Sequence, residues 1–438
     1  MERFYFLIVR LTRRAVRRGT GQLLLIAVAA GVAQAQSTLF FPAAERSRAS
    51  QVHGASPRLD ALNPAFLGLW PDSLGDAIRN PAVAGGPGRG MAAYDNDVGA
   101  WAFQALGSLG PLGWQGGVIT GAAETGPWTG FSVARGHLSM PPFPVASLGL
   151  LPTSRSWTEI RGGISLPLGA RHRAGIAVTH GELGPEPVYL PYRETLEASG
   201  RGWGATVGWV AAPGVGWETE VAGGWQDGTT RGNYLYPWVD AYGGDTRRRY
   251  GWGRVGLSRG TARRWALAFE FGSRLESLGG GGALLAREFR STEVAVAASR
   301  QWTWRRLTLG VLGRVAGGTF TDKQTEGVCT IECSTWSNTA RASRWIPEAG
   351  VAAEVALGWG VRVRGSAVGR AERGVFDVPP WLASSYHVDS GRTTVVRADV
   401  DLRAGLSLAP ALAPFTIDVA APVTNTTGRW AAAVTLRF

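Results

Sequence analysis

The sequence predicts an all-β protein, a transmembrane antiparallel β-barrel of about sixteen strands, with fourteen as the alternative count. Apolar and polar residues alternate over many long stretches, and the connections between these stretches alternate between short and long. After residue 35, no apolar run is long enough to form a membrane-spanning helix. Alternation with a period of two places the apolar side chains on one face of a strand, as in strands that cross a membrane.

Residues 1–35 have the pattern of a secretory signal. Six arginines and a single acid precede an apolar core at Leu23–Val32, which is followed by the small-residue exit Ala33-Gln34-Ala35. This arrangement predicts cleavage before Gln36 and export from the cytoplasm. A short N-terminal anchor helix is the alternative interpretation. We therefore expect a bacterial outer-membrane location, reached through a cleaved signal peptide.

Residues 36–98 differ from the rest of the chain, because they are rich in proline and glycine and show little alternation. They predict an irregular segment that lies inside the barrel as a plug or caps its periplasmic mouth. One short helix is expected over 72–79, capped by Asp72 or Ser73 and ended by Pro81.

Residues 99–438 carry the alternating pattern and are predicted to form the barrel. Over 264–275, for example, Trp265, Leu267 and Phe269 alternate with Ala266, Ala268 and Glu270. Short turns on one side and long loops on the other are typical of outer-membrane barrels, and the alternative is a soluble β-sandwich or propeller. The predicted strands are 99–107, 113–122, 128–136, 156–166, 171–181, 201–211, 215–226, 249–259, 263–275, 287–299, 302–317, 347–358, 361–371, 394–408, 412–420 and 428–438.

Charged residues occur on the strand faces opposite the apolar ones, which places them in the lumen. Their mixed signs predict ion pairs between neighbouring strands. Two interpretations stay open, since such residues either line a pore or hold a closed barrel together. The candidate lumen-lining residues are Glu218, Glu220, Glu270, Arg274, Arg362, Arg364, Arg397, Asp399, Asp401 and Arg403.

The remaining chemistry-bearing residues give few signals. Cys329 and Cys333 lie in one predicted loop, and a disulfide is the default for a cysteine pair in an exported protein. The five histidines show no zinc-binding spacing, and no phosphate-binding loop or nucleophile elbow occurs. We therefore predict no catalytic residues, metal or cofactor. The arginines are spread along the chain rather than clustered, so no nucleic-acid partner is expected.

The last strand, Trp430-x-x-x-Val434-x-Leu436-x-Phe438, resembles the C-terminal signal of bacterial outer-membrane barrels. That resemblance implies recognition by the barrel-assembly machinery and contact with outer-membrane lipid. The stretch Asp76–Ala82 is similar to an Asn-Pro-Ala element near the start of fatty-acid-transporter (FadL-like) and PorV-like barrels, which have fourteen strands. Asn63 and Pro64 begin a second copy of the tripeptide, so Asn63, Pro64, Asn80 and Pro81 form the candidate plug element.

These features favour a channel or transporter for small solutes or hydrophobic compounds. A barrel that docks a periplasmic or secreted protein partner is the second hypothesis, and an outer-membrane enzyme is the third. The identity of a substrate depends on loop folding and lumen radius, which the pattern of strands does not determine.

Overall fold

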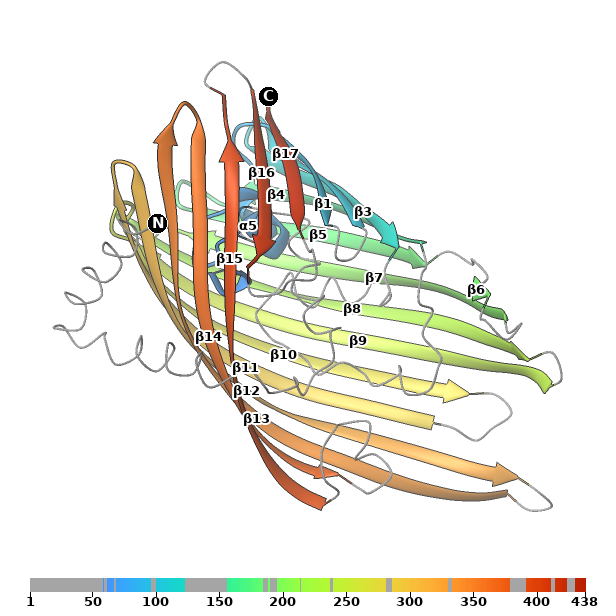
Figure 1. Cartoon of the computed structure of the whole chain (residues 1–438). Coiled ribbons are helices and arrows are strands. Elements are labelled where there is room, and N and C mark those ends of the chain that lie inside the picture. Colours follow the sequence, from blue (N-terminus) through green and yellow to red (C-terminus); the bar gives the residue numbers. More distant parts are fainter. Residues whose placement is uncertain are drawn as a thin grey trace.

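A computed structural model provides the architecture of the chain (Figure 1). It describes residues 58, 61–66, 68–95, 100–122, 156–183, 188–189, 195–212, 214–236, 239–280, 286–329, 333–378, 391–410, 414–423 and 430–438.

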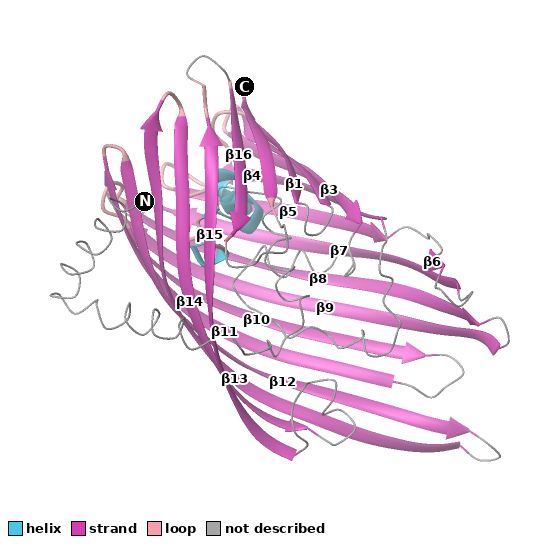
Figure 2. Ribbon diagram, in the orientation of Figure 1, coloured by secondary structure: helices cyan, strands magenta, loops and turns pink. Residues whose placement is uncertain are grey.

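The described strands form one closed antiparallel barrel of sixteen strands, as predicted (Figure 2). Each strand pairs with the next along the chain, and β1 pairs with both β2 and β17, which closes the circle. The two-residue β6 adds only to one end of β7. The strands are β1 Arg89–Asp95, β2 Ala100–Leu109, β3 Leu112–Ala122, β4 Ser156–Pro167, β5 His172–Leu183, β6 Val188–Tyr189, β7 Thr195–Ala211, β8 Trp217–Tyr236, β9 Val239–Arg259, β10 Trp265–Gly280, β11 Ala286–Trp304, β12 Leu307–Cys329, β13 Cys333–Gly358, β14 Val361–Val378, β15 Gly391–Leu408, β16 Phe415–Pro422 and β17 Ala431–Arg437.

The barrel begins earlier than the sequence pattern indicates. Residues 89–95, assigned to the N-terminal segment, form the first strand, β1. Its small residues, such as Ala92 and Ala93, give too little contrast between the two faces for alternation to be visible. The predicted strand 128–136 lies outside the described residues, and β3 pairs directly with β4. The count of sixteen is thus reached with a different first strand.

Two predicted loops, 227–248 and 318–346, are largely strand. β8 continues to Tyr236, and β9 begins at Val239. In the same way, β12 continues to Cys329, and β13 begins at Cys333. The outer face carries Thr, Ser and charged residues in these extensions, so the apolar signal disappears although the backbone ladder continues. Figure 1 shows these strands projecting well beyond the shorter β16 and β17. In the described ladder, β15 pairs with β16 only from Arg403 to Leu408.

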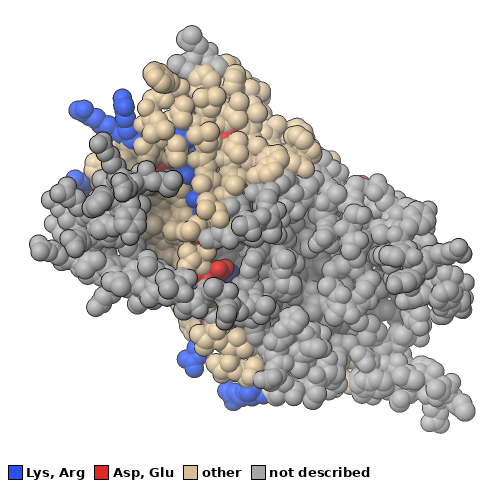
Figure 3. All heavy atoms as spheres, viewed as in Figure 1, with Lys and Arg blue, Asp and Glu red and all other residues tan. Residues whose placement is uncertain are grey.

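The outer face of the barrel is an apolar band. On β10, Leu267, Phe269 and Phe271 point outward and are exposed, while Ala266 and Ala268 point inward and are buried. Figure 3 shows that uncharged residues dominate the described surface in the upper part of that view. A large exposed apolar surface is unfavourable in water but matches the hydrocarbon of a bilayer. Among the described residues, no helix is long and apolar enough to cross a membrane.

Replacing an outward residue in the middle of this band tests the placement of the bilayer. Val255 on β9 is 49% exposed and lies between Arg259 and Arg249 on the outer face. Val255→Arg is expected to destabilise the barrel by about 2–4 kcal/mol in lipid, because the charge enters hydrocarbon. Thr319→Arg, exposed on the extension of β12, should cost less than about 1 kcal/mol. Urea unfolding in vesicles compares the two, and equal costs would contradict the placement.

The described part of the N-terminal segment that precedes β1 lies inside the barrel (Figure 2). It contains the short helix α5 (Ser73–Arg79) and two single turns of 3₁₀ helix, η1 (Pro64–Phe66) and η2 (Pro81–Val83). We call residues 58–88 the plug, of which 58, 61–66 and 68–88 are described. Leu62, Phe66 and Trp70 are almost fully buried against Ala268 and Leu312 of the wall. The interior of the barrel is therefore packed at the level of the plug.

Candidate functional site: the plug and the lumen wall

The helix of the plug starts and stops where its sequence indicates. Asp72 is the N-cap, and its carboxylate accepts a hydrogen bond from the Gly75 amide at 2.9 Å. The helix ends before Asn80, whose backbone amide donates to the Asp76 carbonyl at 2.8 Å. Pro81 follows and opens the next turn. The predicted helix over 72–79 thus agrees with α5.

The two Asn-Pro-Ala copies share the same side-chain cap and the same kind of turn. The Asn63 side-chain oxygen accepts from the Ala65 amide at 3.0 Å, and the Asn80 side-chain oxygen accepts from the Ala82 amide at 3.1 Å. Each asparagine therefore caps one 3₁₀ turn that begins with proline. Asn63 also adopts a positive φ of 71°, which asparagine tolerates better than most residues.

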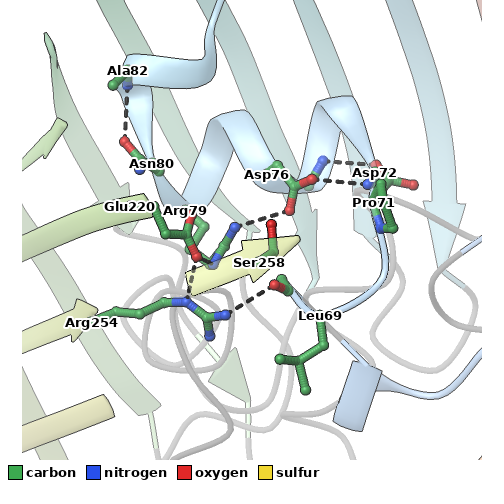
Figure 4. Close-up of polar contacts among 12 residues, drawn as sticks. Leu69, Pro71, Asp72, Asp76, Arg79, Asn80, Ala82, Glu220, Arg254 and Ser258 are labelled. Carbon is green, nitrogen blue, oxygen red and sulfur yellow. Dashed lines mark hydrogen bonds and ion pairs between the residues drawn. The ribbon is translucent and has the colours of Figure 1, made fainter. Parts of the chain in front are cut away.

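The plug is anchored by a buried network of alternating charges. Arg79 donates to Glu220 of β8 at 2.5 Å and to Asp76 at 3.1 Å. Arg254 of β9 donates to the same Glu220 oxygen at 2.9 Å and also to Glu270 of β10. Figure 4 shows Glu220 between the two guanidinium groups. Buried charges persist only when paired, so this network fixes the plug to the wall.

The wall also supplies donors to backbone carbonyls of the plug. Arg254 donates to Gly68 O at 3.0 Å, and Gln301 donates to Leu69 O at 2.8 Å. Other wall side chains donate to further plug carbonyls. Arg161 donates to Ile78 O, Ser165 and Arg173 both donate to Ala84 O, and Ser366 donates to Ala61 O. Irregular backbone leaves carbonyls without a ladder, and a buried carbonyl needs a partner. The polar inner wall provides these partners.

A second group of ion pairs holds the start of the plug. Arg58 donates to Glu354 of β13 at 3.2 Å, and Arg364 of β14 donates to the same carboxylate at 2.6 Å. Arg364 also donates to Asp418 at 2.6 Å. Nearby, the Asn63 amide donates to Asp401 of β15 at 3.0 Å. The start of the plug is therefore bound to β13 and β15, whereas Arg79 near its other end is bound to β8.

Glycines of the wall make room for the second Asn-Pro turn. A Cβ at Gly208 of β7 would overlap the Asn80 side chain, and one at Gly175 of β5 would overlap Pro81 backbone atoms. Any larger residue would push the turn from the wall, so these two positions require the smallest residue.

The predicted lumen residues divide into three groups. Glu220, Glu270 and Arg364 are buried on the inner wall within the ion-pair networks. Asp401 and Arg403 pair at 2.8 Å, and Arg362 lies 3.7 Å from Glu354 although it is exposed. Glu218 and Asp399 are exposed. The side chains of Arg274 and Arg397 lie outside the described residues. Whether any of these residues lines a passage stays a prediction.

The sequence-based choice of residues missed a ladder of charge pairs on β11–β14, beyond the plug toward the long-strand end. Arg314 donates to Glu348 at 2.7 Å, and Arg344 lies 3.4 Å from Glu293 and 3.6 Å from Glu372. Phe320 and Phe376 pack edge to face, with their ring centres 6.1 Å apart. Alternation with the outward-facing Val315 could have identified Arg314 as inward-facing. It could not have identified the partner Glu348, which is 34 residues away in the sequence.

Three other predicted sites stand as follows. Cys329 and Cys333 face each other in the β12–β13 register, but their side chains lie outside the described residues, and no disulfide is present among those described. Trp430, Val434, Leu436 and Phe438 all lie exposed on the outer face of the last strand. In the described part of the chain, no group of three or more His, Cys, Asp or Glu residues could hold a metal ion.

Asp76 gives the docked plug a pH dependence. Burial raises the pKa of its carboxyl to about 6, although Arg79 opposes the shift. Because the docked form favours the protonated acid, docking is expected to weaken as pH rises from about 4 to 6. Asp76→Asn should remove this slope from the pH dependence of the thermal unfolding midpoint, while Asp399→Asn, at an exposed position, should leave it. An unchanged slope in Asp76→Asn would contradict the assignment.

Comparisons with known proteins find weak similarity to solved structures. No protein-family model matches the chain, and no curated protein sequence matches it. The structure is similar to the ferric yersiniabactin receptor FyuA of Yersinia pestis, with 9% identity, TM-score 0.34 and 80% of each chain covered. It is also similar to the iron transporter FrpB of Neisseria meningitidis, with 9% identity, TM-score 0.40 and coverage of 77% of this chain and 61% of FrpB.

A third similar structure is the toluene transporter TbuX of Ralstonia pickettii, with 13% identity and a TM-score of 0.37. The match covers 87% of this chain and 99% of TbuX. At such scores, the cargo of these proteins does not carry over. The chain is a closed sixteen-stranded antiparallel β-barrel with an apolar outer band and with the plug in its lumen.

Proposed function

We propose that the protein is a gated passage for small polar solutes across a bacterial outer membrane, and that the plug is its gate. The observation that carries this proposal is the plug itself, held in the lumen by the network of Arg79, Glu220, Arg254 and Glu270. A barrel of sixteen strands encloses a wide lumen unless something fills it. A filling held by ion pairs and hydrogen bonds can be released without breaking the barrel wall.

The chemistry of the wall favours polar cargo over hydrophobic compounds. Beyond the plug, the inward side chains of β12–β14 include Arg314, Glu348, Arg344 and Glu372, which form ion pairs between neighbouring strands. Charged walls offer hydrogen bonds to a polar solute and repel an apolar one. The outer-membrane location and the cleaved signal peptide are part of this proposal, supported by the apolar outer band and by the pattern of residues 1–35.

A reversible tether of the plug tests the gate. Ser366 of β14 donates to the Ala61 carbonyl at 3.0 Å, so cysteines at these two positions would lie close together. In planar bilayers, Ala61→Cys/Ser366→Cys should show no openings when oxidised and should regain the openings of the unmodified chain after reduction. Ala61→Cys alone and Ser366→Cys alone, which both keep the chain's own Cys329 and Cys333, are the controls and should open under both conditions.

Two outcomes would contradict the gate. Openings that continue unchanged in the oxidised double variant, with the cross-link verified by mass spectrometry, would show that current does not require plug movement. If neither the unmodified chain nor any variant shows openings, the passage itself is contradicted.

Assembly of the barrel is proposed to depend on the last residue. Deleting Phe438 is expected to reduce the amount of folded barrel in the outer membrane without blocking export, because the terminal strand resembles the assembly signal. Phe438 also packs over Gly88, and its amide donates to the Gly88 carbonyl at 3.0 Å. Heat-modifiability on gels measures the folded fraction. Phe438→Tyr is the control, and normal levels of folded barrel after the deletion would remove the argument.

A further inference from the structure

The outer face of β7–β9 changes character abruptly at a row of tryptophans. Trp203 and Trp225 are both 53% exposed, and below them the outer residues are apolar, such as Val207 and Val221. Indole side chains prefer the boundary between hydrocarbon and water. Trp203 and Trp225 therefore mark the edge of the apolar band on the side of the long strands.

Immediately beyond this edge, the outer residues are arginines. Arg201 lies two residues beyond Trp203 on β7, and Arg249 lies two residues beyond Gly251, the register partner of Trp225. Arg247 is the next outward residue on β9. On β13 and β14, Trp345, 62% exposed, pairs in register with exposed Arg373, so this arginine lies at the edge itself. We call Arg201, Arg247, Arg249 and Arg373 the arginine belt.

The spacing fits the layer of lipid headgroups. Two residues of strand span about 7 Å, and four residues span about 13 Å. The tilt of the strand shortens both distances when they are measured along the membrane normal. The headgroup layer extends about 5–7 Å beyond the hydrocarbon on each side of a bilayer. Guanidinium groups at this distance from the tryptophans lie at the depth of lipid phosphates.

The described carboxylates near the arginine belt do not neutralise all of its positive charge. Asp227 accepts from Arg247 at 3.0 and 2.5 Å and lies 3.5 Å from Arg249, so it serves two arginines. Glu182, the register partner of Arg201, lies 2.9 Å from His180. Arg247 and Arg249 therefore share one described carboxylate, which leaves an excess of positive charge on this part of β9.

We infer that the arginine belt binds phosphate groups of the lipid leaflet around the long-strand side of the barrel. Arginine suits this role because its planar fork pairs with phosphate oxygens through two parallel hydrogen bonds. The tryptophans hold the barrel at the depth where these bonds form. This inference requires the membrane placement but not the passage of solutes.

Lipid binding to the purified full chain tests the belt. Dissociation constants for phosphatidic acid and phosphatidylcholine are measured by native mass spectrometry from detergent micelles. The unmodified chain should prefer phosphatidic acid. Arg201→Gln and Arg249→Gln should each reduce that preference about five-fold, and the double variant should reduce it further. Raising the ionic strength should weaken the preference in the same direction.

Lys323→Gln is the matched control. It also removes one exposed positive charge, but Lys323 lies six residues beyond Gly317, the register partner of Trp345, or about 20 Å along the strand. The Lys323→Gln variant should prefer phosphatidic acid over phosphatidylcholine as strongly as the unmodified chain does. No preference in the unmodified chain, or an equal loss in Lys323→Gln, would overturn the belt. Bilayer conductance is measured separately, so failure of the gate and failure of the belt are distinguishable.

Discussion

Deleting residues 37–84 is expected to convert intermittent openings into a large, permanent conductance while the barrel still folds. The deletion removes the buried side chains of Leu62, Phe66 and Trp70 and the ion pairs of Arg79. It stops before Gly85, because the Gly86 amide donates to Ser108 at 2.7 Å and β1 begins at Arg89. The wall then encloses a lumen from which the plug has been removed.

Planar-bilayer recordings measure the conductance, and heat-modifiability on gels checks that the barrel is folded. Deletion of 37–56 is the matched control, because it shortens the same segment but leaves every described residue in place. It should conduct like the unmodified chain. A folded 37–84 deletion with unchanged conductance would mean that the plug does not occlude the passage.

The barrel was predictable because a membrane imposes a strict rule on it. Each strand crossing hydrocarbon must present apolar residues on alternate positions, so the pattern at Leu267, Phe269 and Phe271 is visible without any structure. Where the rule does not apply, prediction failed. The extensions of β12 and β13 have polar outer residues such as Thr319 and Arg341, and sequence alone could not separate them from loops.

The plug was predictable in outline and not in its contacts. Its apolar residues had no other surface to cover, which indicated the lumen, and Asn80-Pro81 indicated a turn. The partner of Arg79 is Glu220, which is 141 residues away in the sequence. No local pattern specifies such a pair, since it depends on the register of the strands that precede β8 and on where the plug enters. Glu220 was identifiable as inward-facing, but Arg254, which binds it, was not selected.

Arg254→Met is expected to destabilise the plugged barrel by about 3–5 kcal/mol, the cost of leaving a buried charge without its partner. Arg254 is 2% exposed and serves Glu220, Glu270 and the Gly68 carbonyl. After its removal Glu220 keeps Arg79, whereas Glu270 loses the guanidinium that binds it. Arg254→Met/Glu270→Gln should therefore recover part of the loss, because the carboxylate charge that Arg254 compensates is also removed.

The matched control is Arg247→Met, which removes an arginine–carboxylate pair from the same strand. Arg247 binds Asp227 at 2.5 Å, but its side chain is 49% exposed, and exposed pairs contribute about 0–1 kcal/mol. Urea unfolding in lipid measures the three variants, and limited proteolysis of the plug reports its release. If Arg247→Met costs as much as Arg254→Met, or if the double variant is less stable than the single one, burial of the network is not what holds the plug. The expected order, with Arg254→Met lowest and Arg247→Met near the unmodified chain, would place the docking energy in the buried network of Arg79, Glu220, Arg254 and Glu270.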